Sequence, residues 1–440
     1  MPTAIPGMFG TGDWATGQRP QSWREAILYQ YPNGDMPLTA IMAKTKSKQI
    51  TDVIHNWFEK TLPLQGVTIT ATYTNAALSA AATGASAAGT IFYVKMAEAD
   101  AKNFRKGHMV LFRDSDYPAV DFAAEVLSNY LNGASSYVCV KTLEADNNVG
   151  SGASYNVTTC DYLQIVSSIQ AQGSSIPTAV AYNPDPKSNY TSIVETSLYL
   201  TRTAKRTRLR TKDQYTEAKR ECLELHGIML ERTMWHSVLY SGTGDNGQPK
   251  TALKGILPAV YGTANADATY NVSDYRYSST YAGQSWKDAG EDWLDEQLEI
   301  AGRYGAPVKM AFCGSGAAQG IAQLAKTNGN IQLTPVREGV YGLHIRKWEH
   351  PSLTLLMKTH PLWNVSPADR YKMVIVPIEN LTYCYIDDTF YKKDKAEQEG
   401  GISSQDATLE SYLTEFTLEY SFLNEFYILD GVGRNNVYVA

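Results

Sequence analysis

The spacing of apolar residues changes along the chain, and each change predicts a different kind of element. From Tyr215 to Tyr240 apolar residues recur at intervals of three and four, which predicts a long amphipathic helix. Further along, apolar and polar side chains alternate from Tyr412 to Phe422, which is the pattern of a long, half-buried strand. Both helices and strands are therefore expected, and the predicted fold class is α+β.

A series of short β segments is predicted before the long helix. Residues 66–90 open with an alternating Val-Thr-Ile-Thr-Ala-Thr-Tyr-Thr sequence, which predicts a strand, and then become rich in small residues, which predicts a turn or a strand edge. The following segments are separated by turn signals and predict a small β barrel or sandwich. They are Ile91–Lys95, His108–Arg113, Ala119–Leu127, Ser136–Leu143 and Tyr155–Val166. Prolines end this module, and another strand is expected from Ile193 to Lys212.

A compact α/β block is predicted after the long helix. A helix is expected at Trp286–Ala301, and a strand, a turn and a helix at Pro307–Cys313, Gly314–Gly316 and Ala317–Lys326. Four more strands are expected at Val340–Lys347, Ser352–Thr359, Tyr371–Ile378 and Leu381–Asp387.

The first 59 residues are rich in aromatic side chains but have too few apolar positions to close a core. They hold three of the eight tryptophans. A capping box at Ser22 and Glu25 predicts one short helix, and Pro37 begins a second that runs to about Lys44. Such a segment is best explained as an arm that lies on a neighbouring subunit. The residues of this arm that we expect to be buried at the subunit interface are Trp14, Arg19, Trp23, Arg24 and Trp57.

Composition excludes several classes of protein. The chain has 440 residues, of which 43% are hydrophobic, so it can form a packed core of two to four structural units. Its longest apolar runs are far shorter than the ~18 residues of a membrane helix, and no signal segment is apparent, so we expect a soluble protein made in a cytoplasm. The net charge of −6 argues against a dedicated nucleic-acid-binding protein.

No catalytic, cofactor or metal site is predicted. Gly242–Gly247 matches GxGxxG but follows a helix, so it is interpreted as a loop. Gly314–Gly316 follows a strand and opens a helix, yet the next glycine is Gly320 and no acidic residue ends the following strand, which favours a packing turn over a nucleotide site. The five cysteines contain no CxxC pair, and the seven histidines show no metal-ligand spacing. The chain is therefore not expected to be an enzyme.

Two charged segments are candidate docking surfaces. Six carboxylates crowd the helix after Trp286, where a solvated or partner-docking face is favoured over a Mg²⁺ site; they are Asp288, Glu291, Asp292, Asp295, Glu296 and Glu299. Residues 202–212 carry six positive charges and no acid. Five of these cations share one face of the predicted strand; they are Arg202, Arg206, Arg208, Arg210 and Lys212. An acidic face of a neighbouring subunit is the first candidate for their partner, DNA phosphates are the second, and a merely solvated edge is the third.

The order of these parts resembles that of the major capsid protein of tailed double-stranded DNA bacteriophages, the Hong Kong 97-type fold. The resemblance is strongest at Arg19–Glu25 (RPQSWRE) and Asn56–Lys60 (NWFEK), which are similar to the opening of one subfamily of phage head proteins. It implies an N-terminal arm at 1–59, and an extended hairpin, the E-loop, at 60–213 with an inserted β module at about 78–177. It also implies a P-domain at 214–301 and 409–440 with a spine helix at 215–240, and an A-domain at 302–408.

The resemblance also implies a function. The chain would self-assemble into hexamers and pentamers of an icosahedral capsid that encloses double-stranded DNA, with the assembled form in the virion and synthesis in the bacterial cytoplasm. Its partners would be copies of itself and DNA bound non-specifically on the inner face, with scaffold, portal and decoration proteins as further candidates and no membrane. Two alternatives remain, namely a nucleotide-binding enzyme that uses residues 307–326 and a phage tail or fibre protein.

Overall fold

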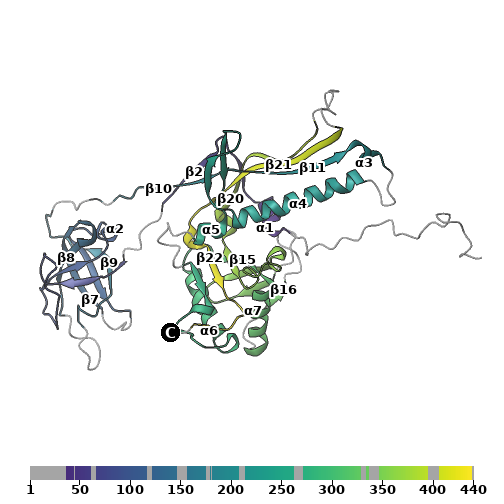
Figure 1. Cartoon of the computed structure of the whole chain (residues 1–440). Helices are drawn as coiled ribbons and strands as arrows, with labels where there is room; N and C mark the ends of the chain where they lie inside the picture. The colour runs from purple at the N-terminus through teal and green to yellow at the C-terminus, as the bar shows by residue number, and fades with distance from the viewer. Residues whose placement is uncertain are drawn as a thin grey trace, which may run out of the picture. The chain divides into compact units, whose positions relative to one another are not determined.

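The computed structural model describes residues 36–43, 45–60, 66–115, 121–145, 156–174, 179, 181–207, 214–261, 271–328, 333–335, 346–394 and 406–438. The chain divides into two compact units (Figure 1), one formed by residues 1–57 and 186–440 and the other by residues 58–185. The helix predicted at Ser22 lies outside the described residues. No helix among those described is long and apolar enough to cross a membrane.

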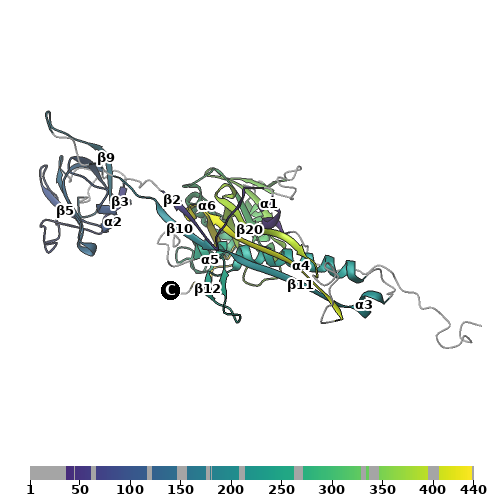
Figure 2. The same cartoon turned by 90° about the horizontal axis from the view of Figure 1, so that it is seen from above.

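The long helix of the first unit is α4 (Gln214–His236), which ends before the predicted Tyr240. It lies along a four-stranded sheet in both views (Figures 1 and 2). The strand order is β1 (Ser47–Gln49), β20 (Leu381–Lys392), β21 (Ala407–Tyr420) and β11 (Ser192–Thr201). Strand β21 runs antiparallel to both β20 and β11, and β1 pairs in parallel with β20. The alternating segment at 412–422 is thus confirmed as a long strand, with bounds shifted toward the N-terminus.

The end of the predicted arm belongs to this core. Helix α1 (Pro37–Met42) buries Leu38, Ile41 and Met42 in the same cluster as Trp235 of α4. The short strand β1 pairs with β20, and β2 (Ile54–Glu59) pairs with β10 (Asp185–Tyr190). The expectation that residues up to 59 lack a core is therefore wrong for 37–57, because the few apolar side chains of α1 complete a core built by distant segments.

A mixed seven-stranded sheet forms the second core of this unit. Its strands, in spatial order, are β14 (Val272–Asp274), β22 (Tyr427–Asp430), β19 (Met373–Val376), β15 (Val308–Cys313), β18 (Thr354–Thr359), β17 (Arg346–Glu349) and β16 (Leu333–Pro335). Side chains of α6 (Trp286–Gly302) and α7 (Ser315–Asn328) pack in this core. The helices and strands predicted for the α/β block are confirmed, except that most of the predicted strand Val340–Lys347 lies outside the described residues.

Short elements complete the first unit. The GxGxxG sequence lies in a β-hairpin of β12 (Tyr240–Thr243) and β13 (Pro249–Ala252), so it leads into a second strand and does not open a helix. Helix α5 (Ile256–Tyr261) follows, and α3 (Arg202–Arg206) lies directly after β11. The 3₁₀ turns of the described chain include Tyr275–Tyr277, Pro361–Trp363, Ile378–Asn380 and Leu423–Glu425.

The second unit contains an antiparallel seven-stranded sheet. Its spatial order is β3 (Gly66–Thr68), β9 (Tyr162–Ser168), β6 (His108–Arg113), β7 (Asp121–Tyr130), β8 (Tyr137–Thr142), β5 (Ile91–Lys95) and β4 (Ala71–Tyr73). The two edge strands are consecutive in the chain. The backbone N–H of Ile69 donates to the carbonyl oxygen of Asp161 beside β9, and the N–H of Thr70 donates to that of Lys95 at the end of β5. One bent segment thus joins both edges and closes the sheet into a barrel.

The barrel is filled as the sequence pattern predicts. Alternate residues of β5, β6 and β8, such as Phe92, Val110 and Val138, are buried in one cluster. Phe112 stacks on Phe122 across the β6–β7 pair with ring centroids 5.0 Å apart. A four-residue helix, α2 (Glu98–Ala101), and a 3₁₀ turn at Gly133–Ser135 lie in its connections. The sheet begins at Gly66 rather than at about residue 78, because β3 and β4 supply its edges.

The placement of α1 in the core predicts that Leu38→Ala is strongly destabilising. The Leu38 side chain is 0% exposed, so its truncation should lower the free energy of unfolding by about 2–5 kcal/mol. Leu225→Ala is the matched control, since Leu225 on α4 is 54% exposed and its loss should cost less than ~0.5 kcal/mol. Chemical denaturation of the unassembled subunit measures both. Equal effects would contradict the burial of α1.

Candidate functional site

Three of the predicted interface residues are described, and the first, Trp57, is buried in its own chain. Its ring packs edge-to-face on Tyr420 with centroids 5.7 Å apart, and His55 stacks beside it. Only 9% of Trp57 is exposed, so it has little surface left for a neighbouring subunit, whereas Phe58 is 74% exposed. The predicted residues outside the described part of the chain are Trp14, Arg19, Trp23, Arg24, Arg208, Arg210 and Lys212.

The basic segment starts as a helix instead of a strand. Thr201 accepts a hydrogen bond from the backbone N–H of Ala204 and so caps α3, which ends β11 before Arg202. Arg202 and Arg206 are four residues apart, so they still share one face. Arg202 Nε donates to Asp406 Oδ1 at 2.6 Å, and both side chains are largely exposed. The predicted five-cation strand face is thus wrong for these two residues, and one anion that meets the segment comes from the same chain.

One face of the four-stranded sheet is covered by α4. His226 of the helix contacts Thr196 of β11 at 3.1 Å and Thr414 of β21 at 2.8 Å. Cys222 Sγ lies 3.3 Å from the Thr196 carbonyl oxygen. Side chains at the alternate positions of these strands therefore point away from α4. We call the surface that they form the outer face.

The outer face carries large apolar side chains. Tyr199 and Leu409 are direct cross-strand partners, and each is 56% exposed. Ile193 on β11 and Phe390 on β20 are exposed as well. Apolar groups gathered on one sheet face are typical of a surface that another protein covers.

A buried carboxylate joins α1, α4 and the segment before the Pro361–Trp363 turn. Glu231 of α4 accepts hydrogen bonds from the backbone N–H groups of Leu38 and Thr39, at 3.0 and 2.7 Å, and from the Thr39 hydroxyl at 2.6 Å. It also accepts from Trp235 Nε1 at 3.2 Å and contacts His360 Nε2 at 2.9 Å. Glu231 thereby satisfies the first turn of α1, whose own N-cap residue offers no side-chain bond.

The surroundings of Glu231 favour its charged form. Burial by itself would raise the pKa of this carboxyl, but the hydrogen bond and charge of His360, with the bonds from Thr39, outweigh it and lower the pKa below the ordinary value of 4.5. His360 is held in turn by a stacked contact with Trp363, with ring centroids 4.6 Å apart. The bonds that Glu231 accepts can fix α1 on α4, which is a structural task.

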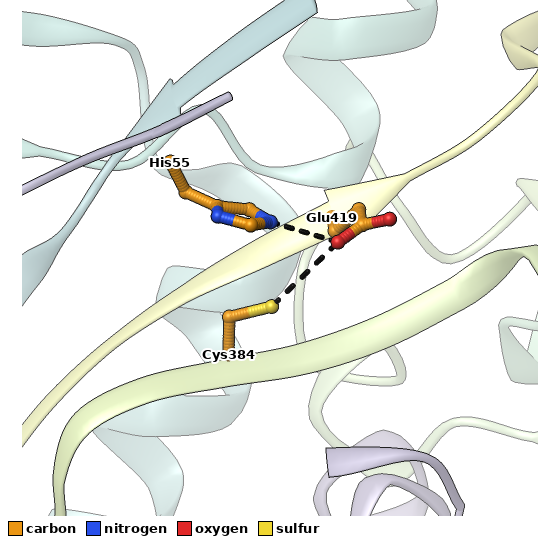
Figure 3. A group of neighbouring side chains, drawn as sticks. All are labelled: His55, Cys384 and Glu419. Atoms are coloured by element: carbon orange, nitrogen blue, oxygen red, sulfur yellow. Dashed lines mark hydrogen bonds and ion pairs between the residues drawn. The ribbon is translucent and has the colours of Figure 1, made fainter. Parts of the chain in front are cut away.

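A second polar group combines three types of metal-binding side chain. His55 of β2, Cys384 of β20 and Glu419 of β21 meet in Figure 3, with one donor atom of each within 4.8 Å of the others. His55 Nε2 lies 2.7 Å, and Cys384 Sγ 3.9 Å, from the same Glu419 oxygen. Burial, with the nearby Glu419 charge, raises the pKa of the Cys384 thiol to about 12.

The strand–turn–helix at 307–326 has the packing function that its glycines predict. A side chain at Gly316 would meet the Tyr371 ring, and one at Gly320 would meet the backbone of Gly433. At the start of α7, the N–H of Ser315 bonds to Asn364 and that of Ala317 to the Arg370 carbonyl oxygen. A cavity of about 440 Å³ lies beside this turn, lined in part by Ser315, Arg346 and Lys358. Because the N–H groups of Ser315 and Ala317 are already bonded, they are not available to a phosphate.

The predicted acidic helix face is largely engaged within its own chain. Asp288 bonds to the Ser285 hydroxyl at 2.6 Å, and Glu299 forms a salt bridge with Arg303 at 2.7 Å. Asp295 lies 3.4 Å from His350 Nε2, and burial raises its pKa. The helix therefore combines local ion pairs with solvent-facing carboxylates.

The comparisons with known proteins identify the family. The family model described as SU10 major capsid protein matches residues 14–432. The chain belongs to this family. A major capsid protein of Pseudomonas phage PaMx41 is 24% identical over 395 residues, which cover 89% of this chain and 85% of that protein. The resemblance to phage major capsid proteins is thus confirmed, and members of the SU10 major capsid protein family are structural proteins of the phage capsid.

Solved structures with some similarity also come from phages. A chain of Mycobacterium phage Cain is 10% identical, with a TM-score of 0.46, and the alignment covers 98% of this chain and all of the other. A chain of the Cyanophage Pam1 capsid is 9% identical, with a TM-score of 0.42 and coverage of 96% and 98%.

Two clusters of this SU10-family chain were not predicted from the sequence. Glu231 and Leu38 are 193 residues apart, and His55 and Glu419 are 364 residues apart. Spacing rules detect ligands within one element or turn, so they cannot detect donors that only the tertiary fold brings together. The one available signal was a carboxylate at Glu231 on the apolar side of the predicted helix, beside Leu230 and Trp235.

The Glu231 cluster predicts that Glu231→Gln destabilises the chain by about 3–5 kcal/mol, because it leaves buried donors without their anion. Glu224→Gln is the control on the same helix, since Glu224 forms an exposed pair with Arg220 at 3.5 Å and should cost less than ~1 kcal/mol. Denaturant titration of the unassembled subunit gives both values.

The sign of the pH dependence follows from the lowered pKa of Glu231. Its stabilising contribution is complete above the ordinary value of 4.5 and is lost as the pH falls toward the folded-state pKa. The stability difference between the wild type and Glu231→Gln should therefore shrink below that pH. A difference that grows on acidification would contradict this account.

Proposed function

We propose that this chain is the repeating subunit of an icosahedral phage capsid and assembles into hexamers and pentamers around double-stranded DNA. The family match over residues 14–432 is the observation that carries the proposal. Each subunit would make modest contacts with several neighbours, and their sum over a closed shell would become strong. The role would be structural, without catalysis.

The outer face supports this proposal. Its apolar residues Ile193, Tyr199 and Leu409 are exposed on a sheet whose other face is already covered by α4. A neighbouring copy that covered the outer face would remove about 25 cal/mol of unfavourable hydration per Å² of apolar surface. Glu195 lies between Ile193 and Tyr199 on the same face of β11, so a contact there would combine apolar burial with bound water.

The proposed subunit retains the domain assignment that the resemblance implies. The arm would be 1–59, the E-loop 60–213 with a β module whose sheet begins at Gly66 instead of about residue 78, the P-domain 214–301 with 409–440, and the A-domain 302–408. Only the part of the arm before Met36 would reach a neighbour, because α1 is buried in its own chain. Trp14, Arg19, Trp23 and Arg24 remain the proposed anchors there, and Arg206, Arg208, Arg210 and Lys212 would meet acidic groups of a neighbour. Scaffold, portal and decoration proteins and non-specifically bound DNA are proposed further partners, and synthesis in the host cytoplasm is part of this proposal.

Assembly of the purified full-length chain tests the proposal. Negative-stain images should show large closed particles or capsomers. A homogeneous monomer, or trimers and tubes without shells, would overturn it and favour a tail or fibre protein. Saturable nucleotide binding that is lost in Gly316→Val would instead support the nucleotide-binding alternative.

Deletion of residues 1–35 should separate folding from assembly. The deletion ends before α1, so the subunit should remain soluble with an unchanged thermal midpoint, but closed particles should no longer form. Thermal unfolding and electron microscopy of the same preparation measure the two effects. Normal shells from the truncated chain would contradict the arm proposal and leave the capsid function intact.

The outer face predicts a second assembly-defective variant. The double substitution Tyr199→Ser and Leu409→Ser removes exposed apolar surface and should change subunit stability by less than ~0.5 kcal/mol per site, while particle yield falls. Sedimentation of the variant beside the wild type measures the yield. Unchanged yield would show that the outer face is not an assembly contact.

A further inference from the structure

The group formed by His55, Cys384 and Glu419 is unusual because its three side chains offer an imidazole nitrogen, a thiol sulfur and a carboxylate oxygen at one point. All three are established zinc ligands, and the combination of sulfur with nitrogen suits Zn²⁺ better than Mg²⁺ or Ca²⁺. They come from β2, β20 and β21, so rigid strands hold each donor. His55 and Cys384 are buried and Glu419 is half-buried.

The distances are close to those of a tetrahedral zinc site. Zinc bonds of about 2.0–2.3 Å place neighbouring ligand atoms about 3.3–3.6 Å apart. The observed separations from Glu419 Oε2 are 2.7 Å to His55 Nε2 and 3.9 Å to Cys384 Sγ. The first pair would have to open, and the second to close, by less than about 1 Å. Figure 3 shows the three side chains turned toward one another, with one donor atom of each within 4.8 Å of the others.

A buried hydroxyl on the same sheet face gives a second observation. Thr417 is the cross-strand partner of Cys384 and lies two residues before Glu419, so its side chain shares their face. It is 0% exposed, and its Oγ1 has no hydrogen-bond partner among the described residues. A buried hydroxyl without a partner is costly. A water molecule in the fourth coordination position of a metal would give it one.

We propose that His55, Cys384 and Glu419 bind a single Zn²⁺ ion, with water as the fourth ligand. Binding displaces the thiol proton of Cys384, which passes to solvent, and the thiolate bonds to zinc. His55 takes the tautomer with its proton on Nδ1, so the Nε2 lone pair binds the ion and the hydrogen bond to Glu419 is replaced by the metal. The ion would tie β2 to β20 and β21, at the point where the N-terminal segment continues into the second unit in sequence. Its role would be to hold β2 on this sheet, without a catalytic step.

Zinc and cobalt binding by the purified full-length chain test the site. After exposure to zinc chloride and dialysis, elemental analysis should find a single zinc ion per chain. Cobalt chloride in place of zinc should give the absorption band of thiolate-to-cobalt charge transfer. Cys384→Ser should abolish the band, and His55→Gln should weaken zinc binding by more than about 100-fold, since loss of even an outer partner costs 10–100-fold.

Cys222→Ser is the matched control, because Cys222 is a buried free cysteine of the same unit that lies on α4, with its sulfur 3.3 Å from the Thr196 carbonyl oxygen, and takes no part in the His55 group. It should leave the cobalt band and zinc content unchanged. Absence of the band in the wild type, or its survival in Cys384→Ser, would overturn the proposal and leave a hydrogen-bonded triad. If Cys384→Ser fails to fold, the wild-type band and the His55→Gln titration still decide the question.

Discussion

The buried carboxylate of Glu231 is the interaction on which the arrangement of the first unit depends. It joins α4 to α1 and to His360, three segments that are far apart in the sequence. A buried charge costs several kcal/mol unless it is fully bonded, so the cluster favours one relative placement of these elements over all others. The apolar side chains of α1 and α4 supply the stability, and Glu231 supplies the specificity.

The position of α4 then determines which surface remains for other chains. The helix covers one face of the β11–β21–β20 sheet through His226 and Cys222, which leaves the outer face with Tyr199 and Leu409 exposed. A monomeric protein would be more stable if its own chain covered these apolar side chains. In the shell proposed for this chain, neighbouring subunits would cover them, and many small contacts would add up to a strong assembly.

Local patterns in the sequence predicted the elements whose structure depends on local rules. The strands at 91–95 and 108–113 have the predicted bounds, since alternation alone defines a half-buried strand. The prediction was wrong where a capping or tertiary interaction determines the end of an element or the burial of a side chain. Thr201 ends a strand that was expected to run to Lys212, and Trp57, expected at a subunit interface, is buried against Tyr420 of its own chain. The Glu231 and His55 clusters were not predictable, because their members are far apart in sequence.

These contacts restrict how the N-terminal segment can move during assembly. Detaching α1 would expose Leu38, Ile41 and Met42, at about 1.5–3 kcal/mol each, and would leave the Glu231 carboxylate buried without its backbone donors. The bond between His55 and Glu419 holds the same segment a second time, at β2, and a zinc ion there would strengthen that attachment. Residues 37–57 are therefore fixed at both ends to their own subunit. In the proposed assembly, an exchange of arms between subunits would use the residues before Met36, so the core would not have to open.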